Sequence, residues 1–177
     1  QCNKAALEII LKISEKQIIA DSSKDSKRLS ALLGNPLFKV RVIYLVRDGR
    51  AIVHSYRRKY NNWVIGWYKL LQTDYATRRL MALYGSDNWL TVRYEDMVTD
   101  LENTMQKICN FTGINFESSM LSPDTSLFNG IAGNRLLTRP IEKIKLDTSW
   151  KTEMSTWMRA FTGLTVYRYN LRYGYRD

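Results

Sequence analysis

The stretch that most limits the fold is an apolar run over residues 40–46, which the polar residues Arg47, Asp48 and Gly49 follow at once. The run is β-branched, aromatic or aliphatic nearly throughout, and this is typical of a parallel strand covered on both faces. Asp48 is a good N-cap residue and predicts a helix that continues to about Tyr60. A strand that leads directly into a helix is the repeating unit of an α/β fold.

The rest of the chain continues this alternation of strand and helix patterns. Apolar residues at helical spacing lie around residues 6–14, 24–33, 63–84 and 101–109, and strand patterns lie at residues 17–21 and 89–93. A last apolar stripe predicts one more buried helix face, formed by Trp150, Met154, Trp157, Met158 and Phe161. We expect one α/β domain over residues 1–177, with a mostly parallel sheet flanked by helices.

The charge is strongly positive and unevenly distributed. The chain of 177 residues carries a formal net charge of +10, and residues 41–80 hold 9 basic and 2 acidic side chains. Such a field attracts anions, among them nucleic acid, an acidic membrane face, a phosphorylated nucleotide and an acidic polymer. No run approaches 18 apolar residues, so we expect no transmembrane segment. Two cysteines, Cys2 and Cys109, give no disulfide framework.

The junction after residue 46 is the strongest candidate for a binding site. Ligands of open α/β sheets lie beyond the carboxyl ends of the strands, where Arg47 is expected. A helix N-terminus beside a guanidinium offers free N–H groups and positive charge to an anion. Ser55 lies two turns further along the helix and can offer its hydroxyl to the same anion. The alternative is that Arg47 pairs with Asp48 or Glu95 and that Ser55 only packs.

Residues 42–55 (VIYLVRDGRAIVHS) closely resemble the 3'-phosphate-binding segment of sulfotransferases that use 3'-phosphoadenosine 5'-phosphosulfate (PAPS). In that family an Arg ends the strand and a Ser lies eight residues later, as Arg47 and Ser55 do here. Further resemblances follow in the family's order: residues 20–24 (ADSSK), 92–98 (VRYEDMV), 108–113 (ICNFTG), 133–135 (GNR), 147–150 (DTSW) and 173–175 (YGY).

The resemblance implies a P-loop-like three-layer fold and a sulfotransferase that moves a sulfonate from PAPS to a hydroxyl or amine acceptor, with carbohydrate a candidate. It implies that the product is adenosine 3',5'-bisphosphate and that no metal takes part. The residues that it implies for nucleotide binding are Arg47, Ser55, Tyr94, Asn134 and Arg135. Lys24 is implied at the sulfonate end as the one catalytic candidate, since a lysine can neutralise charge on a transferring group.

Two departures from the family pattern stand out. The family opens with a strand, a loop that cradles the 5'-phosphosulfate, and a helix, and nothing in this sequence matches that loop. We therefore expect the N-terminal strand to be missing and the chain alone to show little activity. The His that often precedes the late Gly by four residues is Asn129 here. The single histidine, His54, is expected to pack or to face solvent, and Glu95 and Asp96 are expected to hold loops by hydrogen bonds.

Three other interpretations stay open. They are a catalytically incompetent nucleotide-binding remnant, a P-loop-like kinase or nucleotide hydrolase, and a basic nucleic-acid-binding module that uses residues 41–80. The resemblance favours a nucleotide cosubstrate over nucleic acid. The oligomeric state is open, and a cytoplasmic location is expected, with a lumenal one as the alternative.

Overall fold

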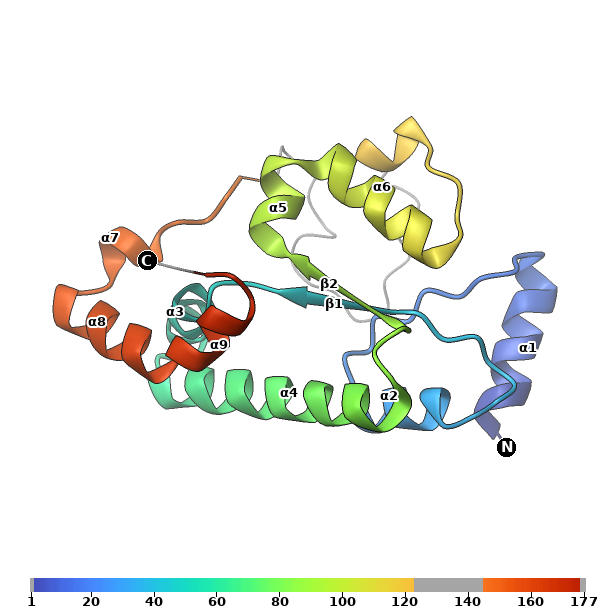
Figure 1. Cartoon of the computed structure of the whole chain (residues 1–177), viewed down its shortest axis with the longest axis horizontal. Helices are drawn as coiled ribbons and strands as arrows, with labels where there is room; N and C mark the ends of the chain where they lie inside the picture. The colour runs from blue at the N-terminus through green and yellow to red at the C-terminus, as the bar shows by residue number, and fades with distance from the viewer. Residues whose placement is uncertain (1, 123–144, 176–177) are drawn as a thin grey trace.

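The structure is a computed structural model of the chain, and it describes residues 2–122 and 145–175. Helices dominate these residues, and two short strands lie among them (Figure 1). The elements in chain order are α1 (Cys2–Ser14), α2 (Ser26–Leu33), β1 (Val42–Val46), α3 (Gly49–Tyr60), α4 (Trp63–Tyr84), β2 (Trp89–Arg93), α5 (Tyr94–Thr99), α6 (Leu101–Thr112), the 3-10 helix η1 (Ser118–Leu121), α7 (Trp150–Glu153), α8 (Thr156–Thr165) and α9 (Tyr167–Arg172).

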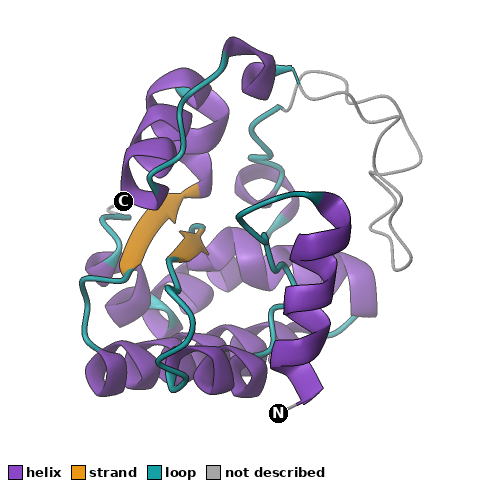
Figure 2. Ribbon diagram, turned by 90° about the vertical axis from the view of Figure 1, so that its right-hand side faces the viewer, coloured by secondary structure: helices purple, strands orange, loops and turns teal. Residues whose placement is uncertain are grey.

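The two strands form the middle layer. They are parallel, and their register places Val42 opposite Trp89 and Val46 opposite Arg93. Helices α5 and α6 lie on one side of the strands and α4 runs along the other side (Figure 1). The view from the side shows the same order of helix, strand and helix (Figure 2). The predicted α/β layering with a parallel sheet is thus confirmed.

The strand predicted at residues 17–21 is wrong, because this segment is irregular and Ile18 is exposed. A strand is stable only when a neighbour satisfies its backbone N–H and C=O groups, and no described strand lies beside it. The predicted cover of both faces of β1 is also incomplete. Ile43 and Leu45 are 41% and 49% exposed, whereas Val46 is buried. Within the described residues, helices therefore cover one face of β1 only in part.

Helices α3 and α4 are joined by a short connection and pack against each other. Asn61 adopts a left-handed conformation at the end of α3, and the side chain of Asn62 accepts hydrogen bonds from the first turn of α4. Gly66 lets α4 approach α3 closely, since an added Cβ would lie 3.0 Å from the Cα of Val53. Val53 belongs to a buried cluster that includes Tyr169 of α9.

The last apolar stripe is divided between two helices instead of lying on one. Trp150 and Met154 pack on Ala51 in a buried cluster, as predicted. Met154 then adopts an extended conformation, and α8 begins after Ser155, at Thr156. This break rotates the following residues, so Trp157 is 67% and Phe161 47% exposed, and the predicted burial of both is wrong.

Candidate nucleotide-binding site

The strand register brings the two strongest candidate residues together. Val46 and Arg93 are partners at the carboxyl ends of β1 and β2, so Arg47 and Tyr94 leave the sheet side by side. The guanidinium carbon of Arg47 lies 4.7 Å from the centroid of the Tyr94 ring, in a cation–π contact. Tyr94 therefore packs against the guanidinium of Arg47, a contact that the sequence did not predict.

One nitrogen of Arg47 is held by a residue that lies 100 positions away. Nη2 donates to the backbone oxygen of Asp147 at 2.9 Å and to its Oδ2 at 3.2 Å. The Nε of Arg47 is buried and has no acceptor among the described residues. A buried donor without an acceptor is costly, so this nitrogen fits an anionic ligand, which no described residue replaces. The predicted alternative pairing of Arg47 with Asp48 or Glu95 is wrong.

We expected free backbone N–H groups at the start of α3, and this prediction is wrong for Asp48, Gly49 and Arg50. Their N–H groups already donate to side chains of the protein. The N–H of Asp48 donates to Glu95 at 3.3 Å, and the N–H of Gly49 donates to Asn170 at 2.8 Å. The N–H of Arg50 donates to Asp48 at 2.8 Å. An anion at this junction would thus meet the side chain of Arg47 and not these three backbone groups of the helix terminus.

The N-cap residue of α3 is part of a buried polar cluster. Asp48 accepts from Nε and Nη2 of Arg50, with the shortest contact at 2.7 Å, and from Nδ2 of Asn170 at 3.2 Å. The guanidinium of Arg50 also lies over the ring of Trp150, 4.5 Å from its centroid. Because the carboxylate is buried and surrounded by donors, we assign Asp48 a structural role, not a catalytic one.

Glu95 serves the same structural purpose at the end of β2, as expected. Its Oε2 accepts from the hydroxyl of Tyr175 at 2.5 Å, and this hydroxyl also lies 3.3 Å from the backbone oxygen of Val46. Burial raises the pKa of the Tyr175 hydroxyl, and the contact with Glu95 adds to the rise. The hydroxyl therefore stays protonated and joins the C-terminal segment to both strand ends. Asp96 is exposed, and no hydrogen bond of its side chain to another described residue tests its expected role.

His54 is buried in the packing around α3, which is one of its two expected placements. Its Nε2 lies 3.3 Å from Oε2 of Glu153, and its ring contacts that of Trp63 at a centroid distance of 6.2 Å. Burial lowers the pKa of His54 below its ordinary value, although Glu153 opposes this shift. A neutral, packed histidine on the inner side of α3 is no candidate for a base that must reach a substrate.

The remaining predicted site residues are not brought to Arg47 by any contact. Ser55 is exposed on α3, and Lys24 is exposed ahead of α2, where Asp25 caps the helix. Lys24 has a left-handed backbone with φ of 58°, which is uncommon for a residue with a side chain. No hydrogen bond or ion pair among the described residues joins either one to Arg47. Asn134 and Arg135 lie outside the described residues, so their roles stay predictions.

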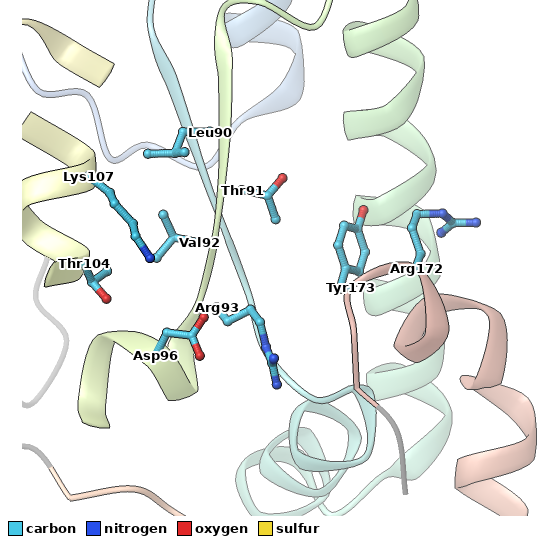
Figure 3. Close-up of a pocket in the computed structure, with 9 residues that line it drawn as sticks. All are labelled: Leu90, Thr91, Val92, Arg93, Asp96, Thr104, Lys107, Arg172 and Tyr173. Carbon is cyan, nitrogen blue, oxygen red and sulfur yellow. The ribbon is translucent and has the colours of Figure 1, made fainter. Parts of the chain in front are cut away.

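An open groove of about 370 Å³ runs along β2. Figure 3 shows Lys107 and Thr104 of α6 on one side of β2 and Tyr173 on the other. Arg93 and Asp96 line its end, but Arg47 does not. The groove therefore follows the edge of β2 and is separate from the Arg47 site. The described residues contain no group of three metal-ligating side chains, and no described helix is long and apolar enough to cross a membrane.

Comparison with known proteins identifies the family. A model described as "Sulfotransferase family" matches residues 29–118, which is just over half of the chain and includes Arg47, Ser55 and Tyr94. The chain therefore belongs to the sulfotransferase family. No curated protein matches it.

Two solved structures share the fold. The sulfotransferase domain from the Synechococcus PCC 7002 olefin synthase is 21% identical with a TM-score of 0.56, and the alignment covers 82% of this chain and 54% of that one. The sulfotransferase domain from the curacin biosynthetic pathway is 17% identical with a TM-score of 0.52, covering 73% of this chain and 53% of that one. The chain thus spans about half the length of these two structures.

Proposed function

We propose that the protein transfers a sulfonyl group from PAPS to a hydroxyl or amine acceptor, with a carbohydrate as the candidate acceptor. The observation that carries this proposal is Arg47, which follows β1 at the sheet's carboxyl edge with a buried Nε that lacks an acceptor among the described residues. Family membership supports a transferase that uses a nucleotide cosubstrate.

The residues of this chain would bind and orient the nucleotide. Arg47 would bind the 3'-phosphate through its guanidinium, with the hydroxyl of Ser55 as a second donor. Tyr94 contacts the guanidinium with its ring. When bound, PAPS supplies the sulfonyl group, and the acceptor oxygen or nitrogen replaces the 5'-phosphate oxygen at sulfur. Positioning and charge neutralisation dominate such transfers, so fixed cationic donors such as Arg47, and Lys24 as predicted, are the expected machinery.

A turnover assay tests the proposed function. The protein is incubated with PAPS and a panel of hydroxyl and amine acceptors that includes sugars. We expect adenosine 3',5'-bisphosphate to form together with a sulfated acceptor, at a low rate because nothing in this sequence matches the phosphosulfate loop, and ATP in place of PAPS to give no phosphorylated product. Phosphorylation from ATP would contradict the proposal in favour of a kinase. Binding of the bisphosphate without turnover under any condition would indicate a nucleotide-binding remnant.

A further inference from the structure

The contact between Arg47 and Asp147 occupies the nitrogen that a phosphate needs most. A guanidinium offers an oxyanion two parallel forks, one formed by Nη1 and Nη2 and the other by Nε and Nη2. Both forks include Nη2. In this structure Nη2 donates to both the backbone oxygen and Oδ2 of Asp147. A two-pronged phosphate contact with Arg47 therefore competes with Asp147 for the hydrogens of Nη2.

The Asp147 carboxylate is a charged competitor for this nitrogen. A hydrogen bond from Ser149 and the contact with Arg47 lower the pKa of Asp147 to about 2, so the group is ionised at neutral pH. The side chain of Asp147 is 39% exposed and that of Arg47 20% exposed, so the pair can open toward solvent. Partly exposed ion pairs of this kind are weak, whereas a phosphate monoester carries nearly two charges at neutral pH.

We propose that Asp147 is a specificity-determining residue, which pairs with Arg47 in the free protein and is displaced by the 3'-phosphate of the bound nucleotide. The inference rests on the proposed function. A dianion can replace the carboxylate on Arg47, but the neutral 3'-hydroxyl of an ordinary nucleotide cannot. The pair thus adds a threshold that favours 3'-phosphorylated nucleotides over those that end in a hydroxyl.

A role for Asp147 in positioning Arg47 predicts the opposite change in nucleotide affinity. If Asp147 only positioned Arg47 for the phosphate, its loss would weaken nucleotide binding. If Asp147 competes, its loss leaves Nη2 with only the backbone oxygen of residue 147, at 2.9 Å, and removes a negative charge beside the phosphate. Asp147→Asn should then bind adenosine 3',5'-bisphosphate about three- to tenfold more tightly, from one lost ion pair and one lost repulsion. Asparagine can still accept the hydrogen bond that the N–H of Ser149 donates to Oδ1 at 3.0 Å.

Isothermal titration of the 177-residue chain with adenosine 3',5'-bisphosphate and with adenosine 5'-phosphate tests the inference. Asp87→Asn is the matched control, because Asp87 is exposed in the turn before β2 and its loss changes the net charge equally. We expect Asp147→Asn to gain affinity for the bisphosphate only, while Asp87→Asn binds both nucleotides as the unchanged chain does. Should Asp147→Asn fail to fold, Asp147→Ser keeps a local acceptor for Ser149 and replaces it.

The outcomes separate the two proposals. If the unchanged chain binds the bisphosphate and Asp147→Asn binds it equally or more weakly, the displacement is wrong and the proposed function stands. If Asp147→Asn gains equally for both nucleotides, the threshold does not concern the 3'-phosphate, and the inference fails. If neither protein binds the bisphosphate in preference to adenosine 5'-phosphate, the proposed function fails and the inference fails with it.

Discussion

Replacing Tyr175 by Phe should destabilise the whole fold, although this residue lies almost at the end of the chain. Its hydroxyl donates to Oε2 of Glu95 at 2.5 Å and lies 3.3 Å from the backbone oxygen of Val46. The substitution keeps the ring, which contacts the guanidinium of Arg93 at 4.3 Å. The loss is therefore confined to one buried hydroxyl that joins the C-terminal segment to β1 and β2.

The expected loss of folding stability depends on the hydrogen bonds that Glu95 retains in Tyr175→Phe. Its carboxylate is then left with the N–H of Asp48 at 3.3 Å, a long contact for a partly buried charge. A hydrogen bond to a charged group contributes about 1.5–3 kcal/mol to stability. At about 2–4 °C per kcal/mol for a chain of this size, the melting temperature should fall by about 3–12 °C.

Thermal unfolding followed by circular dichroism measures this loss, with Tyr167→Phe as the matched control. Tyr167 begins α9, is exposed, and its hydroxyl has no hydrogen bond among the described residues. We expect the control to melt within about 1 °C of the unchanged chain, as exposed substitutions do. Equal melting temperatures for Tyr175→Phe and the unchanged chain would refute the view that this tyrosine joins the strand ends.

Two further predictions concern packing and pH. Gly66→Ala should destabilise by about 1–3 kcal/mol, because its Cβ would meet the Cα and O of Val53 at 3.0 and 3.1 Å, whereas Gly163→Ala should stabilise by about 0.5–1 kcal/mol, since its nearest contact is 3.8 Å in an open part of α8. Urea unfolding checks both, and a loss of equal size at the two positions would contradict the close helix approach. Because the pKa of His54 is below 6.5 in the folded protein, the unfolded chain takes up a proton there more readily than the folded chain. The stability of the fold is therefore full above pH 6.5 and is reduced as the pH falls toward the pKa of the folded state. The free energy of unfolding should thus decrease from pH 7.5 to 5.5, and less so in His54→Gln; the same slope in both proteins would contradict a buried neutral histidine.

Local patterns in the sequence were enough to predict most elements. The N-cap Asp48 and the strand before it predicted β1 and α3, and α4 and β2 have the predicted limits, Trp63–Tyr84 and Trp89–Arg93. These signals are local, since capping and apolar spacing act within a few residues. The failures depend on distant partners. The segment at residues 17–21 has strand-forming residues but no neighbouring strand among the described ones, and the stripe after Trp150 breaks at Met154 because two short helices pack separately.

The site was predicted only in part, because some of its contacts are local in the sequence and others join distant residues. Arg47 and Tyr94 could be placed because each follows a strand, and parallel strands bring their carboxyl ends together. The partner of Arg47 could not be predicted, because Asp147 lies 100 residues away. The segment that contains Asp147 resembles the family, but the resemblance implied no role for this residue. Asn170 gave no signal at all, since an amide that accepts from Gly49 and donates to Asp48 follows no short sequence pattern.

The most direct test of the central claim, that Arg47 binds a nucleotide 3'-phosphate, compares two arginines that bracket β1. Arg47 follows the strand, whereas Arg41 precedes it, is exposed, hydrogen-bonds Asn88 and lies over Phe111. Calorimetric titration with adenosine 3',5'-bisphosphate should show a loss of about 10- to 150-fold for Arg47→Ala, the value of one charge-assisted contact. Arg41→Ala removes the same charge and should stay within about twofold of the unchanged chain, as expected for a screened charge at a distance. Equal losses for the two variants, or unchanged affinity in Arg47→Ala, would contradict the assignment of the 3'-phosphate to this strand end.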